Sequence, residues 1–446
     1  MATRVHYDVV IAGGGTAGCV LAGRLSAEPD RTVCLVEAGP DYGPYSDGRW
    51  PPDILDGRFL ALDSHCWECD DEEDRSQRRA RILGGCSSHN ACALLRGADE
   101  DYDEWGPDWS ADELRPYLDR AEREFATRTL DLEELSPWLR AFAEAGGSES
   151  IVHPVNLTTD GVRWNAAFGW LDPVRGRPNL TILGDTLVDR VLLEGMRAVG
   201  ISTSRGDIGA DTVVVTASAY GSPAILLRSG IGPQSGLPVG ENLVDHVGTG
   251  MGWEPTDELR ADWDAWERRH DLSFSGVTIA MRSRSCEAGV CDLFVFPASE
   301  PGYEISGAVF AMKPRSRGRV TLTADDPRAP LHIEHGFLSE EADMSVLVEG
   351  FERLRELGRT GPVRRYAARE SRPGEGVSAE DHVRASARGF FHPTGTCRMG
   401  SVVDDRGRVF GYDGLIVADA SIMPTIPRAN TNLTTAAIAE KLAETI

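Results

Sequence analysis

The chain has 446 residues, of which 41% are hydrophobic and 26% are charged, so it can bury a large core and has the composition of a soluble enzyme of two or three domains. Its formal net charge of −24 argues against nucleic acid and anionic membrane surfaces as partners, because no basic face remains to neutralise phosphates. No stretch approaches the roughly 20 apolar residues that span a bilayer. The segment before the first strand lacks the pattern of a signal peptide, and nine cysteines, an odd number, fit a reducing compartment. We therefore expect a cytoplasmic protein.

The first predicted element is an apolar strand at residues 7–12, which runs directly into a glycine-rich turn and then a helical pattern. This order is typical of a dinucleotide-binding unit. Gly13 would make the tight turn, Gly15 would let backbone amides reach a pyrophosphate, and Gly18 would let the helix pack closely on the strand. The glycines alone do not distinguish NAD from FAD.

A second apolar strand, at residues 32–39, contains Glu37. An acidic residue at this distance from the glycine turn commonly accepts a hydrogen bond from a ribose hydroxyl. Strand, turn, helix and acid in this order are more specific than the glycines alone, so we predict a nucleotide site in this part of the chain.

The central part of the chain predicts a second, mostly antiparallel sheet. Strand candidates lie at residues 291–299 and 307–314, and a turn at 316–318 leads into a further apolar stretch. Residues 431–446 have the apolar stripe of a helix. The N-terminus of that helix would point toward the candidate site and favour negative charge there.

Two polar residues near the C-terminus are the best candidates for chemistry. His392 lies in the segment FFHPTGTCRMG, and Asn430 lies in PRANTNLTTAAIAEK. An imidazole can take a proton near neutral pH, and an amide can donate to an oxygen without titrating, so the pair could hold and deprotonate a hydroxyl group. Taken singly, His392 could instead be structural and Asn430 could be a helix N-cap.

Nine segments along the chain together resemble the glucose-methanol-choline (GMC) family of flavin-dependent oxidoreductases. They follow the family order, at residues 7–25, 35–43, 81–97, 177–183, 221–233, 239–246, 316–322, 392–400 and 414–432. The resemblance implies FAD as the cofactor and no metal. It also implies an α/β (α+β overall) fold, in which a Rossmann-like FAD-binding domain is interwoven with a substrate domain on a mostly antiparallel sheet.

The same resemblance implies domain boundaries and site residues. The FAD-binding domain would comprise residues 1–125, 177–250 and 390–446, and the substrate domain residues 126–176 and 251–389. His392 and Asn430 would be the catalytic pair. The residues that would bind FAD are Gly13, Gly15, Thr16, Ala17, Gly18, Glu37, Ala38, Trp67, Gly85, His89, Asn90, Ala91, Cys92, Ala93, Val188, Asp419, Ala420 and Thr431.

His89 leads to a sharper hypothesis. It ends the segment GGCSSH at residues 84–89, which is similar to the choline oxidase subgroup, where this histidine is bonded to the flavin ring. We therefore hypothesise that FAD is attached covalently through His89. The alternative is a buried histidine that forms hydrogen bonds near the flavin without a covalent bond.

The resemblance implies that the protein oxidises a small-molecule alcohol to a carbonyl compound. His392 would take the hydroxyl proton while a hydride leaves to flavin N5. We expect an oxidase that uses O2. The sequence leaves open a dehydrogenase that uses a quinone or another acceptor, a hydroxynitrile lyase, a non-catalytic flavin-binding protein and an NAD-dependent dehydrogenase.

The substrate is less well defined. Choline oxidases hold a quaternary ammonium with aromatic residues and a carboxylate, whereas segment 274–285 offers two arginines and no carboxylate, which argues against choline. A neutral alcohol, a sugar hydroxyl and a natural-product intermediate all stay open.

Three departures from the family pattern bear on the cavity. Ser218 stands where a glycine is usual, only residues 233–239 join two family segments that are usually further apart, and the chain is shorter than is typical. We therefore expect trimmed loops over the substrate cavity. Such loops would suit a bulky substrate or a lid from a second subunit, and the oligomeric state stays open.

Overall fold

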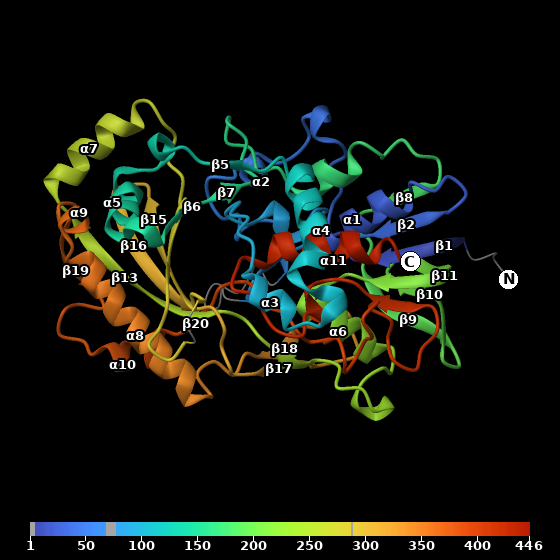
Figure 1. Cartoon of the computed structure of the whole chain (residues 1–446). Helices are drawn as coiled ribbons and strands as arrows, with labels where there is room; N and C mark the ends of the chain where they lie inside the picture. Colours follow the sequence, from blue (N-terminus) through green and yellow to red (C-terminus); the bar gives the residue numbers. More distant parts are fainter. Residues whose placement is uncertain (1–4, 68–76, 287–288) are drawn as a thin grey trace.

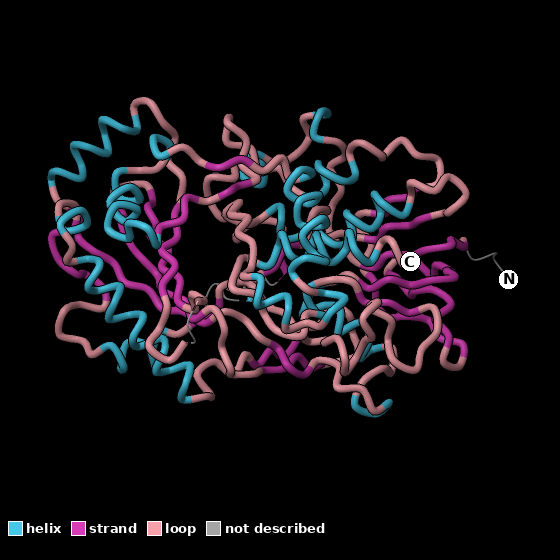
Figure 2. The backbone as a smooth tube through the Cα atoms, viewed as in Figure 1, coloured by secondary structure: helices cyan, strands magenta, loops and turns pink. Residues whose placement is uncertain are grey.

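The computed structural model describes residues 5–67, 77–286 and 289–446, and it contains two large sheets flanked by helices (Figure 1). The strands gather in two groups at opposite ends of the view, with most of the remaining chain between and around them (Figure 2). The mixed helix and sheet class predicted from the sequence is confirmed.

The first sheet carries the glycine-rich turn. Its strand order is β8 (Leu180–Leu183), β2 (Val33–Val36), β1 (His6–Ala12), β11 (Gly206–Val215), β10 (Arg197–Thr203) and β9 (Val188–Glu194), and β21 (Leu415–Val417) also pairs with β11. The pairs from β8 to β11, and the pair of β11 with β21, are parallel, whereas β11, β10 and β9 pair antiparallel. Residues 9–12 of the central strand β1 are buried, which explains their unbroken apolar run.

The turn after β1 needs glycine at two positions. Gly13 has a φ of +119°, a conformation that residues with a Cβ rarely adopt. A Cβ on Gly18, in helix α1 (Thr16–Leu25), would lie 1.9 Å from the carbonyl oxygen of Gly13. The absence of a side chain at both positions therefore sets how the helix leaves the strand.

Helices cover this sheet. α1 packs on α11 (Thr431–Leu442), α11 packs on α4 (Ala111–Glu124), and α6 (Ser218–Arg228) packs on β9. Two short helices, α2 (Pro52–Leu55) and α3 (Asp99–Asp103), lie in the connections. The helix predicted at 431–446 is confirmed and ends at Leu442.

The second sheet is antiparallel. Its order is β19 (Ala367–Arg372), β13 (Val247–Pro255), β16 (Glu304–Ala311), β15 (Leu293–Glu300), β14 (Val277–Met281) and β6 (Ser150–Val152), and β20 (Arg388–Gly389) also pairs with β13. β15 and β16 overlap the strands predicted at 291–299 and 307–314. The outer face is covered by helices, of which α5 (Pro137–Gly146) and α8 (Glu341–Gly358) contact the strands directly (Figure 1). The other helices of this half are α7 (Asp257–Glu267), α9 (Gly361–Arg364) and α10 (Ala379–Ser386).

Three smaller sheets complete the fold: β12 (Glu241–Leu243) with β17 (Gly318–Leu322) and β18 (Leu331–Glu334), β3 (Cys66–Trp67) with β4 (Arg79–Ala80), and β5 (Arg128–Thr129) with β7 (Pro154–Val155). Cys66 is disulfide-bonded, which weakens the argument from cysteine content for a reducing compartment. Within the described residues, no helix combines the length and apolar character that a membrane crossing requires.

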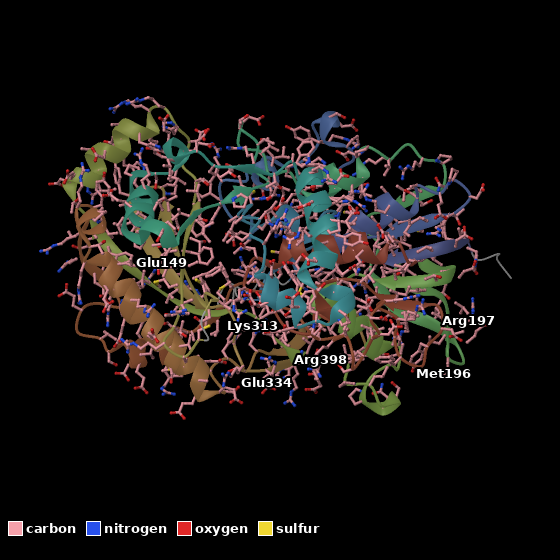
Figure 3. The ribbon with its side chains drawn as sticks, viewed as in Figure 1. Glu149, Met196, Arg197, Lys313, Glu334 and Arg398 are labelled. Atoms are coloured by element: carbon pink, nitrogen blue, oxygen red, sulfur yellow. The ribbon has the colours of Figure 1, made fainter. Side chains whose placement is uncertain are left out.

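A buried carboxylate ties the two halves together. Lys313, which follows β16 and lies near the middle of the molecule (Figure 3), places its Nζ 2.8 Å from Asp101 Oδ1 in α3. Asp101 also accepts hydrogen bonds from the guanidinium and the backbone N–H of Arg428. The second sheet, α3 and the chain just before Asn430 are therefore joined at one carboxylate.

Candidate active site

A cavity of about 1170 Å³ is lined by residues of both large sheets. The predicted site residues that line it are Gly13, Gly15, Thr16, Ala17, Glu37, Ala38, Trp67, Gly85, His89, Asn90, Ala91, Ala93, Val188, His392, Asp419, Ala420, Asn430 and Thr431. Gly18 and Cys92 do not. Gly18 packs on Gly13 behind the turn, and the buried thiol of Cys92 donates to the carbonyl oxygen of Gly57 at 3.4 Å.

Glu37 is held at the glycine turn by backbone groups. Its two carboxylate oxygens accept hydrogen bonds from the N–H groups of Gly14, at 2.8 Å, and Gly39, at 2.9 Å. Burial raises the pKa of Glu37 to about 7. Each oxygen has a second lone pair, so the carboxylate can still accept a hydrogen bond from a hydroxyl group of a ligand.

Asp419 and Ser218 stabilise the neighbouring loop. Asp419 accepts hydrogen bonds from the backbone N–H of Ser218, at 2.8 Å, and from the hydroxyl of Ser222, at 2.6 Å. Ser218 has a φ of +73°, in the region that favours glycine. The backbone at this position therefore has a conformation that suits the glycine found in most family members, although the residue is a serine.

His89 has an imidazole nitrogen with no protein partner. The residue is 3% exposed, and among the described residues nothing forms a hydrogen bond with its Nε2. Burial lowers the pKa of His89 to about 3, so the imidazole is neutral at physiological pH. Buried polar atoms are rarely left without a partner, so this nitrogen, beside the cavity, is available to a bound group.

The structure brings His392 and Asn430 together. The Asn430 side-chain Nδ2 lies 3.4 Å from His392 Nε2, and both residues line the cavity. Asn430 precedes α11, but its side chain makes no capping hydrogen bond, and its buried Oδ1 has no partner in the part of the chain that the structure describes. The side chain therefore faces the histidine instead of capping the helix.

His246 determines which nitrogen of His392 carries the proton. His246 Nε2 lies 3.0 Å from the carbonyl oxygen of Pro427, which can only accept, so this nitrogen is the protonated one. Burial lowers the pKa of His246 to about 3, so the ring is neutral and its Nδ1 is an acceptor. Because His392 Nδ1 lies 3.0 Å from that acceptor, it carries the proton of His392. His392 Nε2 is then the unprotonated nitrogen beside Asn430.

His392 itself is a neutral base. Burial and the neighbouring His246 ring hold its pKa well below the ordinary value. A hydroxyl group placed between Asn430 and His392 would therefore meet one N–H donor and one nitrogen that can accept its proton.

Asp245 fixes the backbone around His392. Its Oδ1 accepts hydrogen bonds from the backbone N–H groups of Phe390, at 3.3 Å, and His392, at 3.0 Å, and burial raises the pKa of Asp245 to about 7. Side-chain atoms of Asp245, His246 and His392 lie within 4.8 Å of one another, as metal ligands would. The contact between the two imidazoles, however, is a hydrogen bond, so we interpret the three residues as a hydrogen-bonded unit.

An aromatic wall stands beside the catalytic pair. The rings of Phe310 and Phe390 stack with centroids 3.8 Å apart, and Phe296 packs against Phe390 at 4.8 Å. Phe390 also contacts the His392 ring, at 4.5 Å between centroids. These aromatic side chains form an apolar surface, which suits an apolar group next to the reacting hydroxyl.

Three polar residues of this site, Asp245, His246 and Asn432, were not identified from the sequence. Asn432 lines the cavity with a buried Nδ2 that has no partner among the described residues. The one available signal was position, because His246 and Asp245 end a family segment and Asn432 belongs to another.

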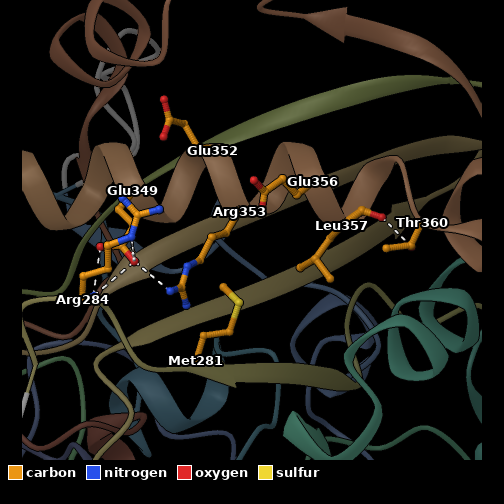
Figure 4. A pocket seen from close by; sticks show the side chains of 8 residues that line it. All are labelled: Met281, Arg284, Glu349, Glu352, Arg353, Glu356, Leu357 and Thr360. Atoms are coloured by element: carbon orange, nitrogen blue, oxygen red, sulfur yellow. Dashed lines mark hydrogen bonds and ion pairs between the residues drawn. The ribbon is translucent and has the colours of Figure 1, made fainter.

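A shallower hollow of about 430 Å³ lies on the outer side of the second sheet, along α8 (Figure 4). Glu349 there forms ion pairs with Arg353, at 2.8 Å, and Arg284, at 3.9 Å. Its charged lining residues are three glutamates and two arginines, and no histidine lines it. The cavity with His392 and Asn430 is therefore the candidate active site.

The sequence matches the GMC oxidoreductase family over residues 7–248 and again over residues 314–439. Together these ranges cover most of the chain and include both the glycine turn and the segment with His392 and Asn430. The protein therefore belongs to the GMC oxidoreductases.

Individual relatives extend over the whole chain. The 5-(hydroxymethyl)furfural oxidase of Methylovorus sp. (strain MP688) is 34% identical over 541 aligned positions, which cover 100% of this chain and 99% of that protein. The oxygen-dependent choline dehydrogenase of Burkholderia multivorans (strain ATCC 17616 / 249) is 31% identical, with 100% and 94% covered. The crystal structure of pyridoxine 4-oxidase from Mesorbium loti superposes with a TM-score of 0.85 and 29% identity, over 98% of this chain and 99% of that one.

These names describe enzymes that act on alcohol groups, and this chain is an enzyme of the same family. The alignment with the furfural oxidase spans more positions than the 446 residues of this chain. The chain therefore lacks segments that this relative has.

Proposed function

We propose that this protein is an FAD-dependent oxidase that converts a small-molecule alcohol to a carbonyl compound and passes the electrons to O2. The main support is the 3.4 Å approach of Asn430 to the unprotonated Nε2 of His392 in the cavity that also contains the glycine turn. The names of the furfural oxidase, the pyridoxine oxidase and the oxygen-dependent choline dehydrogenase support an alcohol substrate and O2 as the acceptor.

The cavity residues fit FAD. Gly13 and Gly15 leave the backbone N–H groups at the start of α1 accessible, which suits a pyrophosphate. Glu37 has lone pairs left for ribose hydroxyls, and the orphaned Nε2 of His89 suits contact with the flavin ring. When bound, FAD would supply the hydride acceptor that the protein itself lacks.

The residues around the alcohol have separate tasks. The Asn430 amide donates to the substrate oxygen, and His392 Nε2 accepts the hydroxyl proton. His246 keeps that nitrogen unprotonated beforehand, and the wall of Phe296, Phe310 and Phe390 keeps water from the reacting carbon. The alcohol would lose one proton to His392 and one hydride to FAD as the acceptor, which would convert its C–O bond to C=O.

Residues 1–125, 177–250 and 390–446 would then form the FAD-binding domain, and residues 126–176 and 251–389 the substrate domain. This division is supported by the two sheets, because the glycine turn lies on the first and the cavity-facing phenylalanines Phe296 and Phe310 lie on the second.

We further propose that His89 Nε2 is the point of covalent attachment of FAD. Its support is that this buried nitrogen has no hydrogen-bond partner among the described residues. Acid precipitation of the purified protein tests the proposal. Yellow colour that stays in the pellet of the native protein and leaves with the supernatant in a His89→Ala variant is the expected result, and colour released from the native protein would contradict it.

The oxidase proposal is tested by mixing the purified protein with a panel of alcohols without O2. Bleaching of the flavin band near ~450 nm by one class of alcohol is the expected result, followed by one hydrogen peroxide per carbonyl formed when air is admitted. His392→Ala should keep the flavin and lose the bleaching. Reduction that recovers only with a dye or quinone would make the protein a dehydrogenase, and a flavin that no alcohol bleaches would favour a lyase.

A further inference from the structure

One face of β13 has no side chains where the strand borders the cavity. Its alternate residues Gly248, Gly250 and Gly252 carry none, whereas Val247 and Met251, which alternate with them, belong to the apolar core. Alternate residues of a strand point to opposite faces. The glycines therefore keep the cavity face of this strand open.

Arg388 occupies the space above these glycines. It pairs with Gly248 through its backbone, and its guanidinium lies so close to β13 that a Cβ on Gly250 would be 3.4 Å from one guanidinium nitrogen. Arg372, at the end of β19, pairs with Gly252 of the same strand. Both arginines line the cavity that contains His392 and Asn430.

In the described part of the chain, neither Arg372 nor Arg388 makes a side-chain hydrogen bond or ion pair, whereas Arg369, on the same strand as Arg372, forms an ion pair with Glu254 at 2.6 Å. Arg372 and Arg388 are both exposed, and the positive charge of Arg372 acts on Arg388. Two exposed guanidinium groups that line one cavity, without a partner among the described residues, are available to bind an anion together.

We propose that Arg372 and Arg388 form an anion-binding subsite, so that the alcohol substrate carries a carboxylate or phosphate group at the end away from its reacting hydroxyl. This inference rests on the proposed function of the same cavity. A guanidinium can bind a carboxylate or a phosphate through two parallel hydrogen bonds, which fixes orientation as well as charge. An anionic alcohol thus takes the place of the neutral alcohol as the proposed substrate class.

The spacing suits a substrate built on one planar ring. Arg388 precedes His392 by four residues, so their Cα atoms are at most about 14 Å apart. Phe390 lies between Arg388 and His392 in the chain, and Phe310, which stacks on it, lines the same cavity. An aromatic alcohol with an acidic group opposite its hydroxymethyl group would touch the arginines, the aromatic wall and the catalytic pair together.

Three alcohols of one shape test this substrate class: 4-(hydroxymethyl)benzoate, 4-(hydroxymethyl)phenyl phosphate and the neutral 4-methylbenzyl alcohol. We expect kcat/KM of the flavin-containing enzyme to be about 10- to 100-fold higher for at least one anion than for the neutral alcohol. The preferred anion distinguishes a carboxylate from a phosphate substrate. Its KM should rise with salt, because ions screen the attraction.

Arg388→Gln and Arg372→Gln should each remove most of this preference, chiefly by raising KM for the anion, and should change kcat/KM for the neutral alcohol much less. Glu300→Gln is the matched control, because Glu300 lines the same cavity and carries the opposite charge. That variant should keep the preference for anions. Flavin content and thermal unfolding show whether each variant is folded, and the salt dependence of the native enzyme does not require a variant.

Two failures are distinguishable. Equal kcat/KM for anionic and neutral alcohols, with no salt dependence, would overturn the anion subsite and leave the alcohol oxidase standing. A flavin that none of the three alcohols nor any other alcohol reduces would overturn the proposed function and the subsite with it.

Discussion

His246 makes one hydrogen bond to His392 and one to Pro427, and substitution by asparagine or by glutamine would retain only one of the two. Asparagine carries its amide as many bonds from Cβ as the ring Nδ1, so His246→Asn keeps an acceptor toward His392. Glutamine carries its amide as many bonds from Cβ as Nε2, so His246→Gln keeps the donor toward Pro427 and leaves His392 Nδ1 without its acceptor. The proton of His392 is then free to move to Nε2, the nitrogen that must be vacant.

The size of the effect follows from the lost contact. A buried N–H without a partner costs about 1–3 kcal/mol, which corresponds to about 5- to 150-fold in rate at ~1.36 kcal/mol for each factor of ten. We expect this loss in kcat of the glutamine variant. KM should change little, because the hydrogen bond from Asn430 to the substrate is retained. The asparagine variant should stay close to the native enzyme.

The measurement is the rate of flavin reduction by saturating alcohol under anaerobic stopped-flow conditions, with flavin content and thermal unfolding as controls for folding. A purely structural role for His246 would lower both variants in proportion to their loss of stability. Equal rates for the asparagine and glutamine variants, whatever their value, would refute the assignment of the His392 proton to Nδ1.

Further predictions concern the turn, the catalytic amide and acid stability. Gly18→Ala places a Cβ 1.9 Å from the carbonyl oxygen of Gly13, so the variant should lose flavin and unfold at a lower temperature, and a yellow variant with native Tm would contradict this. Asn430→Ala should keep FAD and slow its reduction by about 10²- to 10³-fold, as loss of an oxyanion donor does; native rates would remove the amide from catalysis. Burial lowers the pKa of His153 to about 3, so unfolding takes up a proton below the ordinary pKa near ~6.5, and the free energy of unfolding falls by about 2 kcal/mol for this residue between pH 7 and pH 5. Denaturant titration at the two pH values should show a smaller fall for His153→Gln, and an identical fall would contradict the assignment.

Much of the fold could be predicted from local signals in the sequence. The buried run at 9–12 and the glycines after it specify a strand, a tight turn and a helix, and the structure has all three. The strands β15 and β16 also lie where their apolar runs predict them. These elements are set by residues close together in the chain, so pattern alone identifies them.

The site was only partly accessible to the same reasoning. His392 and Asn430 could be selected as proton acceptor and donor by residue type, but His246 lies 146 residues before His392 and only the fold brings the rings together. Its proton is set by the carbonyl oxygen of Pro427, a backbone atom that no side-chain pattern reveals. The sequence also drew attention to the arginines of 274–285, which do not line the cavity, whereas Arg372 and Arg388 are among the arginines that do.

The buried Asp101 has a consequence for how precisely the catalytic amide is placed. Asp101 binds Arg428, two residues before Asn430, and the same carboxylate binds Lys313 from the second sheet. A shift of that sheet relative to α3 would therefore be transmitted through the chain to Asn430. The alignment of the amide with the substrate is thus a property of the interface between the two halves, and substitutions at that interface, far from any bound alcohol, should change the efficiency of proton transfer.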